Sequence, residues 1–447
     1  MSGPMDNALL VLNAGSSSLK FAVYQADAAG SLQAVYRGVV EEIGGNGRLR
    51  IFQAPDASGQ SDQAVAVADH PQALQRLLDA LETRHPGLQF SAAGHRVVHG
   101  GADYSHPVRV DENVLSDLDK LIPLSPLHQP HNLAAIRALA AMRPQLPQVA
   151  CFDTAFHHTL PPLARRFALP REFDERGIRR YGFHGTSYVY TAKRAAVLLG
   201  KEPKDTNLII CHIGNGASIS AVRNGVGVDT SMGMTPLEGL VMGSRCGDLD
   251  PAILPYVMNR TGMSAKEMDM ILNKKSGLIG LCGISDRRDV RKEAEDGNER
   301  AKTAIAVECH RLRKYIGAYA AILGRVDALV FTAGVGEMAP HIREKSTKDL
   351  DILGIKLDLR KNAMAQCRNA ELEINTADSP VKIFVIPTDE ELVMTEDAYA
   401  LMTGTYDVHM NFTYSFQSKD YKNKAREQGL IENLKKKPEL AELIVRP

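Results

Sequence analysis

The chain has 447 residues, of which 44% are hydrophobic and 24% charged, a balance typical of a globular protein with a sizeable core. Its 53 basic residues equal its 53 acidic residues, which argues against broad, non-specific binding to nucleic acid or to anionic lipid. The length predicts two or three domains.

The N-terminal residues 1–7 carry an acid and no basic stretch before the first apolar run, so they do not resemble a secretory signal. No run reaches the roughly 20 apolar residues that span a bilayer. The six cysteines form no CxxC pair, and we expect them to be reduced thiols in a cytoplasmic α/β protein that does not bind membranes.

The first predicted element is a strand, turn and strand: an apolar run at 8–12, a small polar turn at 13–18 and a second run at 19–24. Residues 44–62 are rich in Gly, Gln, Asp and Ser and predict loops at hairpin ends. Pro71 predicts the start of a helix, because the leucines at 74, 77, 78 and 81 recur at helical spacing.

A second helix is predicted at 130–142, and the pattern then restarts with a strand at 149–152. Another apolar strand at 207–211 is followed by a small-residue turn at 212–218 and a strand at 219–222. This sequence of elements repeats the layout of the N-terminus. We interpret it as a topological repeat.

A long helix is predicted at 298–323, followed by a strand at 328–332 and a third small-residue turn at 334–337. A last strand at 381–386 leads into a helix that ends near Met402. From Gly404 the tail becomes polar and aromatic and then basic. Its aromatic residues could dock on the rest of the chain or on a partner.

Three small-residue turns therefore follow apolar strands. Glycine lets backbone N–H groups converge and hydroxyl groups add donors, which is what a polyphosphate requires. One such turn is more often a plain hairpin, but three on comparable strand ends favour phosphate binding. The P-loop pattern is absent from the sequence, so these loops would hold the nucleotide.

Three cationic side chains stand after a small-residue turn or beside glycines. Lys20 follows the first turn, and facing solvent or facing a phosphate are equally good interpretations. Arg96 and Arg245 lie beside glycines, and their guanidinium groups match carboxylate and phosphate oxygens. For Arg245 the alternative is a surface ion pair with Asp248 or Asp250.

His184 lies between glycines before a predicted helix, and this loop position weakens the interpretation as a core histidine. Asp153 ends a strand near the apparent domain boundary, where substrate clefts tend to lie. Its carboxylate could act in such a cleft, cap a helix or form a buried ion pair. Thr388 and Glu391 fit a capping box, which leaves Glu390 as the freer carboxylate for a hard cation.

From about Leu9 to about Met402, a series of motifs resembles the acetate kinase (acetokinase) family. They are Asn13–Phe21, Arg96–Gly101, Gly182–Ser187, Thr230–Gly239, Gly243–Asp248 and Phe331–Glu337. The family belongs to the superfamily of actin, sugar kinases and heat-shock ATPases. The resemblance therefore implies two duplicated actin-like (ribonuclease H-like) α/β domains with an interdomain cleft, which would explain the repeat.

The same resemblance implies an N-terminal domain of residues 1–151 plus about 391–403 and a nucleotide-binding domain of residues 152–390. Residues 404–447 form a C-terminal extension without a counterpart in the family pattern. A homodimer is also implied.

The implied activity is reversible transfer of the γ-phosphoryl group of ATP to acetate, giving acetyl phosphate and ADP. The resemblance assigns catalysis to Arg96, Asp153, His184 and Arg245, and assigns Mg²⁺, for which Mn²⁺ can substitute, to Asn13 and Glu390. The residues implied for ATP or ADP are Lys20, His212, Ile213, Gly214, Asn215, Gly216, Asp286, Arg287, Arg288, Gly334, Val335, Gly336, Glu337 and Met338. The implied acetate site consists of Arg96, Val98, Leu127, Phe183 and Pro236.

Three positions depart from the family pattern: Met338 and Asp389 stand where Asn is common, and Tyr188 where His is common.

The transfer chemistry follows from charge. A carboxylic acid with a pKa of ~4 is already ionised at neutral pH and needs no general base. Its repulsion from the phosphoryl group is relieved by cations on both reactants. We therefore expect Asp153 to orient an arginine or a metal-bound water.

Two alternatives remain open. A kinase that prefers propionate or butyrate differs by methylene groups worth about 1–3 kcal/mol each in an apolar pocket, although Val98 favours acetate. A binding protein of the same superfamily that is gated by ATP would need the phosphate turns, but not Arg96, Arg245 and His184 together.

Overall fold

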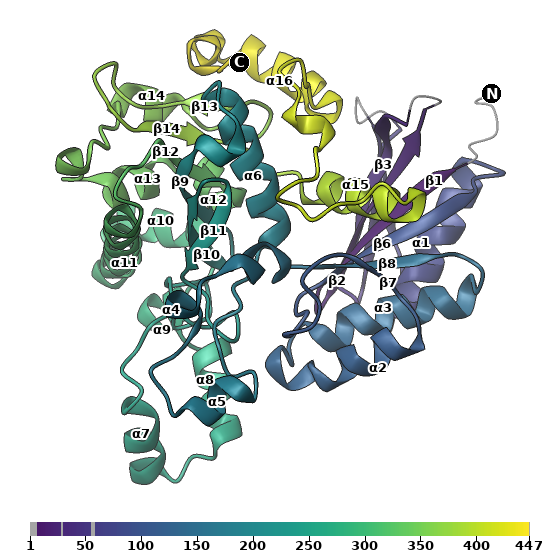
Figure 1. The fold of residues 1–447 in the computed structure, drawn as a ribbon, viewed down its shortest axis with the longest axis horizontal. Helices are drawn as coiled ribbons and strands as arrows, with labels where there is room; N and C mark the ends of the chain where they lie inside the picture. Colours follow the sequence, from purple (N-terminus) through teal and green to yellow (C-terminus); the bar gives the residue numbers. More distant parts are fainter. Residues whose placement is uncertain (1–6, 28–29, 55–58, 447) are drawn as a thin grey trace. The chain divides into compact units, whose positions relative to one another are not determined.

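The computed structural model describes residues 7–27, 30–54 and 59–446 (Figure 1). Residues 1–6, 28–29, 55–58 and 447 lie outside the described residues. They include most of the predicted N-terminal segment and part of the predicted loop at 44–62. The chain divides into two compact units. Unit 1 comprises Met1–His158, Gly185–Tyr190 and Asp389–Glu432, and unit 2 comprises Thr159–His184, Thr191–Thr388 and Asn433–Pro447.

Within the described residues, unit 1 contains a sheet of eight strands in the order β5-β4-β3-β2-β1-β6-β8-β7. The strands are β1 (Ala8–Ala14), β2 (Ser18–Ala26), β3 (Leu32–Glu41), β4 (Arg48–Gln53), β5 (Ser61–Ala64), β6 (Phe90–Val97), β7 (Val108–Arg109) and β8 (Gln148–Phe152). Strand β1 is antiparallel to β2 and parallel to β6, and β6 is parallel to β8. The carboxyl ends of β1, β6 and β8 therefore meet at one edge of the sheet.

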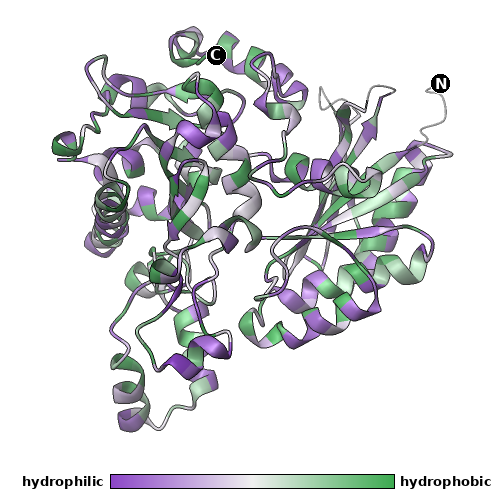
Figure 2. Ribbon diagram, in the orientation of Figure 1, coloured by the Kyte–Doolittle hydropathy of each residue, from purple (hydrophilic) through white to green (hydrophobic). Residues whose placement is uncertain are grey.

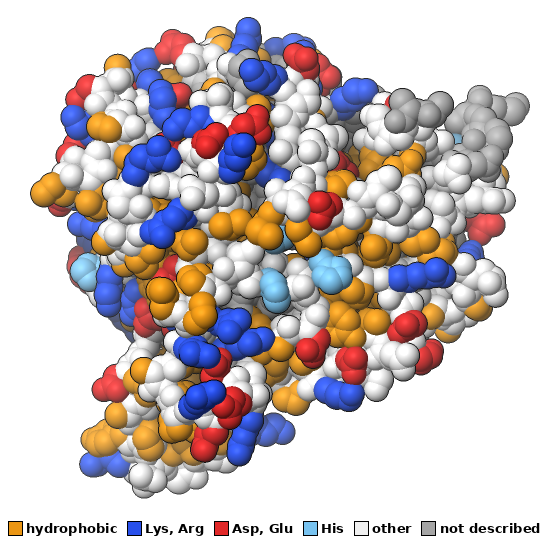
Figure 3. Space-filling model, in the orientation of Figure 1, with side chains coloured by type: hydrophobic (Ala, Val, Ile, Leu, Met, Phe, Trp, Pro, Cys, Tyr) orange, Lys and Arg blue, Asp and Glu red, His pale blue; other side chains and the backbone are white. Residues whose placement is uncertain are grey.

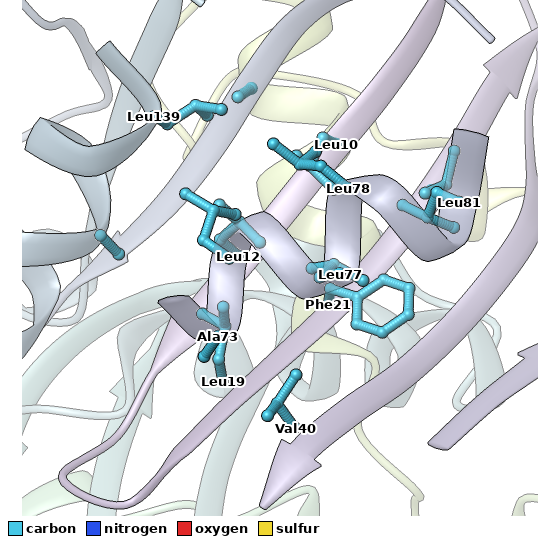
Figure 4. Packing of buried hydrophobic residues seen from close by; sticks show 14 of the residues in the cluster. Leu10, Leu12, Leu19, Phe21, Val40, Ala73, Leu77, Leu78, Leu81 and Leu139 are labelled. Carbon is cyan, nitrogen blue, oxygen red and sulfur yellow. The ribbon is translucent and has the colours of Figure 1, made fainter. Parts of the chain in front are cut away.

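Helices cover both faces of this sheet. They are α1 (His70–Arg84), α2 (Glu112–Lys120), α3 (Gln129–Met142) and α15 (Glu390–Thr403). Helix α1 starts beside Pro71 as predicted, is capped by Asp69, and buries its leucines against β1, β2 and β3 (Figure 4). Each leucine buried in this way contributes about 1.5–3 kcal/mol. Helix α15 packs Met394 and Ala398 against Leu9 and Val11 on the opposite face.

Unit 2 contains, in the part of the chain described, a sheet of six strands in the order β11-β10-β9-β12-β14-β13. The strands are β9 (Asn207–Ile213), β10 (Ala217–Arg223), β11 (Val226–Thr230), β12 (Ala328–Thr332), β13 (Leu372–Glu373) and β14 (Lys382–Val385). Strand β9 is antiparallel to β10 and parallel to β12, and β12 is parallel to β14. These relations are those of β1, β2, β6 and β8. The predicted topological repeat and α/β class are confirmed.

The remaining helices belong to unit 2 or join the units. They are α4 (Pro162–Arg165), α5 (Arg171–Glu175), α6 (Gly185–Leu198), α7 (Ile253–Thr261), α8 (Ala265–Lys274), α9 (Gly277–Cys282), α10 (Arg287–Glu295), α11 (Glu299–Leu323), α12 (Ala333–Met338), α13 (Pro340–Thr347), α14 (Leu359–Met364) and α16 (Lys424–Lys436). Helix α11 is the long helix predicted at 298–323, with Asn298 as its N-cap.

Three local predictions are wrong. The loop predicted at 44–62 contains strand β4, in which Leu49 and Ile51 are buried at alternate positions between exposed or half-buried residues. The turn predicted at 334–337 is helix α12, because Ala333 has a φ of +64° and turns the chain into the helix within one residue. The N-cap of α15 is Asp389, whose side chain accepts from the Leu392 N–H, so the predicted capping box does not form.

The predicted C-terminal extension is divided between the units, with residues 404–432 in unit 1 and 433–447 in unit 2. Tyr414 and Phe416 are 1% and 0% exposed, and Phe416 packs on Tyr190 with ring centroids 4.6 Å apart. The aromatic part of the tail therefore docks on the rest of the chain. The basic run Lys435–Lys437 is exposed.

The surface agrees with the composition. Figure 2 shows α2 banded in hydrophilic and hydrophobic colours, as its inward Leu115 and Leu118 require. Figure 3 shows basic and acidic side chains interspersed over the face in view, as the zero net charge predicts. None of the helices within the described ranges is long and apolar enough to cross a membrane.

Candidate active site

The first group of predicted site residues lies at the carboxyl edge of the unit 1 sheet. Asn13 is in β1, Arg96 is in β6 and Asp153 directly follows β8. Arg96 Nε donates to Asp153 Oδ1 at 2.8 Å, and Arg96 Nη2 donates to Asp153 Oδ2 at 2.6 Å. Arg96 Nη1 donates to Asn13 Oδ1 at 3.3 Å. The parallel pairing of the three strands thus brings these three side chains together.

This pair fixes the position of a guanidinium group at the edge of the sheet. The Asp153 side chain is 1% exposed and that of Arg96 is 20% exposed. Burial disfavours the charged guanidinium group, but the neighbouring Asp153 carboxylate outweighs it and raises the pKa of Arg96 above its ordinary value. Two donors of Arg96 occupy the two oxygens of Asp153. This geometry suits a carboxylate that orients a guanidinium group.

Glu390, the first residue of α15, lies within electrostatic reach of this group. Burial raises the pKa of Glu390 to about 7, and the nearby Asp153 adds to the increase, whereas Arg96 and the exposed Lys20 oppose it. Its Oε1 atom is buried and has no hydrogen-bond partner among the residues described. A buried carboxylate oxygen without a donor is a position that a cation would stabilise.

The residues present fit a magnesium ion. Glu390 and Asn13 offer carboxylate and amide oxygens, which are the ligand types of this hard cation. No group of three or more His, Cys, Asp or Glu side chains suited to a metal occurs in the described part of the chain. Mg²⁺ does not require one, because water molecules and substrate phosphates usually complete its shell.

The second group of predicted residues lies in unit 2 around Gly216. His184 Nδ1 is 2.8 Å from Ser218 Oγ, and its ring stacks on that of His212 with centroids 4.0 Å apart. A Cβ atom built at Gly216 would lie 3.5 Å from Arg245 Nη1 and 3.6 Å from His184 Nε2. Arg245 and His184 therefore face the same small volume beside a backbone that carries no side chain.

The loop that presents Arg245 is fixed by its neighbours. Arg245 Nη1 donates to the Pro236 carbonyl at 2.9 Å. Asp248, one of the two ion-pair partners considered for Arg245, lies 3.4 Å from Arg311 and accepts from Tyr315. Gly247 has a φ of +68°, and a Cβ there would lie 2.4 Å from the Leu240 carbonyl oxygen, so the turn requires glycine.

A cavity of about 440 Å³ opens in unit 2 beside this region. Its lining comes from the turn at 214–215, from residues 285–291, from residues 334–341 and from Arg368. The lining residues are Gly214, Asn215, Ser285, Asp286, Arg287, Arg288, Arg291, Gly334, Val335, Met338, Ala339, His341 and Arg368. Four arginines in one lining suit an anionic ligand of the size of a nucleotide.

Arg287 ties this cavity to the phosphate turn. Its Nε donates to Glu308 Oε1 at 2.6 Å and its Nη1 donates to the Gly214 carbonyl at 2.7 Å. Its Nη2 is buried and has no partner among the described residues, so it is a donor available to a ligand. Arg288 is 90% exposed and bonds to Asp286, the N-cap of α10, and these bonds lower the pKa of Asp286 to about 2.

Not every predicted nucleotide residue lines this cavity. Lys20 belongs to unit 1, and His212, Ile213, Gly216, Gly336 and Glu337 are outside the lining. Conversely, the sequence analysis missed Arg291, Arg368 and His341. Arg291 follows Arg287 by one helical turn, a spacing that could have revealed it. Arg368 is in a loop distant in sequence and carried no local signal.

The residues predicted for the acetate methyl group remain a prediction. Val98 and Leu127 belong to unit 1, and Phe183 and Pro236 belong to unit 2. Val98 and Phe183 are buried, at 4% and 1% exposure, and the other two are half-buried.

Among the departures from the family pattern, Tyr188 is fully buried and stacks on Phe156. Met338 is 36% exposed and lines the 440 Å³ cavity. Size alone does not identify a site, because a larger cavity of about 530 Å³ beside the ends of α1 and α3 contains no predicted site residue.

Comparison with known proteins decides the family. The model of the acetokinase family matches residues 8–396. The chain belongs to the acetokinase family. It is therefore an enzyme of the kinase class, with the two-domain fold of the actin-like ATPases. The family resemblance drawn from the sequence motifs is confirmed.

Relatives of the acetokinase family cover the chain to different extents. The acetate kinase of Treponema pallidum is 49% identical over 445 residues, 98% of each chain. That of Geobacter sulfurreducens is 49% identical over 423 residues, 93% of this chain and 100% of its own. Because the match with the Treponema enzyme covers 98% of this chain, it includes most of the C-terminal extension at 404–447. This extension lies beyond residue 396, where the family match ends.

Solved structures of the acetokinase family have the same fold. Porphyromonas gingivalis acetate kinase matches with a TM-score of 0.80 and 39% identity, covering 89% of this chain and 100% of its own. A propionate kinase from Francisella tularensis matches with a TM-score of 0.81 and 39% identity, covering 88% and 99%. The fold therefore does not discriminate between the two acyl substrates.

Proposed function

We propose that this protein transfers the γ-phosphoryl group of ATP reversibly to acetate, giving acetyl phosphate and ADP. The observation that carries the proposal is the bidentate Arg96–Asp153 pair at the sheet edge of unit 1. A permanently charged, oriented guanidinium group suits a substrate that is a carboxylate. The acetate kinases among the relatives support this choice of substrate class.

The proposed roles follow from the charges. Arg96 holds the acetate carboxylate, and its remaining N–H groups approach that anion while Asp153 keeps the guanidinium plane fixed. Arg245 and His184 stabilise the charge that develops on the transferred phosphoryl group beside Gly216. The acetate oxygen attacks phosphorus in line and the ADP oxygen leaves, without a covalent enzyme intermediate. Asp153 removes no proton in this scheme.

Asn13 and Glu390 are the residues that would hold Mg²⁺. When bound, the ion supplies positive charge to the phosphate oxygens. The protein contributes the Glu390 carboxylate, whose buried Oε1 atom has no hydrogen-bond partner among the described residues. In unit 2, the arginine-lined cavity holds ATP, with the buried Arg287 Nη2 as a donor.

A preference for propionate or butyrate is the alternative within the family. One additional methylene changes the discrimination by about 1–3 kcal/mol, and Val98 favours the smaller acid. An ATP-gated binding protein is the alternative from another class. We also propose a homodimer in the cytoplasm, as the family resemblance implies; light scattering after gel filtration measures the subunit number.

The experiment is a panel of acetate, propionate and butyrate with ATP and Mg²⁺, in which hydroxylamine traps acyl phosphate as the hydroxamate. We expect a hydroxamate with acetate and a higher kcat/KM for acetate than for propionate. A higher kcat/KM for propionate would reassign the substrate. ATP turnover without any hydroxamate would favour the binding protein.

A further inference from the structure

The part of the C-terminal extension in unit 1 is bonded to helix α15, the helix that begins with Glu390. Tyr414 Oη donates to Asp397 Oδ1 at 2.7 Å, and the Ser415 N–H donates to Glu396 Oε2 at 2.8 Å. Tyr414 is fully buried. The extension is therefore attached to the second turn of α15 by two carboxylates.

A third carboxylate connects the extension to the start of the same helix. Asp389 is 1% exposed and caps α15 by accepting from the Leu392 N–H at 3.2 Å. Arg37 Nη2 donates to both of its oxygens, at 2.9 and 3.2 Å. Asn423 Nδ2, from the extension, donates to Asp389 Oδ2 at 2.7 Å. The carboxylate thus accepts from its own helix, from β3 and from the extension.

Two of the three attached residues lie on one face of α15. Asp389 and Glu396 are seven residues apart, which is close to two helical turns, so they lie on the same side of the helix. The contacts with the extension therefore fix both the position and the rotation of the helix N-terminus. Glu390 follows Asp389 directly, so its backbone moves with this cap.

The cap also faces a guanidinium group, because Arg37 Nη2 donates to both oxygens of Asp389. An ionised cap also suits the positive end of the helix dipole. Because hydrogen bonds to a charged group contribute more than neutral ones, the bond from Asn423 is one of the stronger contacts of the extension.

We propose that Asn423 of the C-terminal extension is a positioning residue for the metal site: by holding the Asp389 cap, it sets the placement of the Glu390 carboxylate. This inference rests on the proposed function, because it takes Glu390 as the Mg²⁺ ligand. It gives the extension a role in metal binding beyond that of covering apolar surface. Substitution of residues that orient a metal ligand through hydrogen bonds commonly changes metal affinity by 10- to 100-fold.

The test compares Asn423→Ala and Asn423→Asp with the full-length wild type. The first removes the donor, and the second places a second carboxylate beside Asp389. We expect the Kd for Mn²⁺ in the presence of ADP, read from the electron paramagnetic resonance signal of free Mn²⁺, to rise about ten-fold for Asn423→Ala. It should rise further for Asn423→Asp, while the KM for acetate stays within about two-fold, because the acetate site is not displaced.

The matched control is Lys419→Ala, which changes an exposed residue of the same segment and should leave the Mn²⁺ affinity unchanged. Glu390→Gln provides the benchmark for loss of the ligand itself. If Glu390→Gln weakens Mn²⁺ binding and Asn423→Ala lowers only the thermal unfolding midpoint, the extension is merely structural and the inference is wrong. Absence of acyl phosphate with the wild type would instead contradict the proposed function.

Discussion

At the carboxyl edge of the unit 1 sheet, one arginine carries the charge and one aspartate orients it. Asp153 engages Arg96 through two hydrogen bonds of 2.8 and 2.6 Å. A base that removed a proton would need to reach the substrate, but a carboxylate nucleophile has no proton to lose at neutral pH. Both the geometry and the chemistry support the proposal that Asp153 orients Arg96.

The substitution Asp153→Asn tests this role. We expect kcat to fall by about 10²-fold, because Arg96 loses one of its two bonds and small misplacements of reacting groups are costly. The acid limb of the pH–rate profile should keep its pKa. Disappearance of that limb together with the rate would show that Asp153 acts as the base.

Arg245→Ala should lower kcat by about 10³-fold or more, as expected when a cation that stabilises transferred phosphoryl charge is removed. Arg245→Lys is the matched variant, because it keeps the charge and loses the planar fork. It should recover only part of the rate. A raised KM with an unchanged kcat in steady-state kinetics would assign Arg245 to ground-state binding.

The substitution Gly216→Ala should impair activity without destabilising the fold. The added methyl would lie 3.5 Å from Arg245 and 3.6 Å from His184, which is ordinary contact, so the thermal unfolding midpoint should change little. The same methyl occupies the volume that both side chains face, and we expect at least a 10²-fold loss of kcat/KM. Gly317→Ala on α11, where an added Cβ meets nothing within 4 Å, should keep full activity and gain up to about 1 kcal/mol of helix stability.

At the scale of elements, the contact between α15 and the extension predicts a pH dependence of stability. Burial raises the pKa of Glu396 to about 7, although the hydrogen bonds from Ser415 oppose this. The folded chain therefore binds a proton that the unfolded chain releases between pH about 4.5 and 7. Stability attributable to Glu396 falls as pH rises through this window, by roughly 3 kcal/mol in total.

Glu396→Gln removes this titration. The thermal unfolding midpoints of the variant and of the wild type are measured from pH 5 to 8. The midpoint of the variant minus that of the wild type should increase with pH and level off above about pH 7. Parallel curves for the two proteins would show that Glu396 does not take up a proton on folding.

The elements that the sequence predicted well are those with strong local periodicity. The leucine spacing after Pro71 predicts α1, and the apolar runs predict β9 and β12 within two residues. Strand β4 was missed because its two buried residues alternate with charged ones in a polar region. The cap of α15 is a local feature, since Asp389 accepts from the Leu392 N–H three residues later. The bond from Arg37 to Asp389 could not be predicted, because the two residues are 352 positions apart in sequence.

For the whole molecule, duplication provides two sheets with equivalent edges. In unit 1, Asn13 and Arg96 lie near the carboxyl ends of β1 and β6, and Asp153 directly follows β8. In unit 2, His212 and Thr332 pair at the ends of β9 and β12. Ligands commonly bind beyond the carboxyl ends of such strands. The motifs could be found in the sequence, and Arg291 could be found by its helical spacing from Arg287. Arg368 joins the cavity lining only through the tertiary fold.

The central claim is that an acetate oxygen attacks the γ-phosphorus of ATP. Acetate labelled with ¹⁸O in both oxygens, incubated with the wild-type enzyme, ATP and Mg²⁺, tests it by phosphorus NMR of the product. We expect acetyl phosphate with one ¹⁸O bonded to phosphorus, seen as an isotope shift, in an amount equal to the ADP formed. Acetyl phosphate without ¹⁸O at phosphorus, or ADP without acetyl phosphate, would contradict the account.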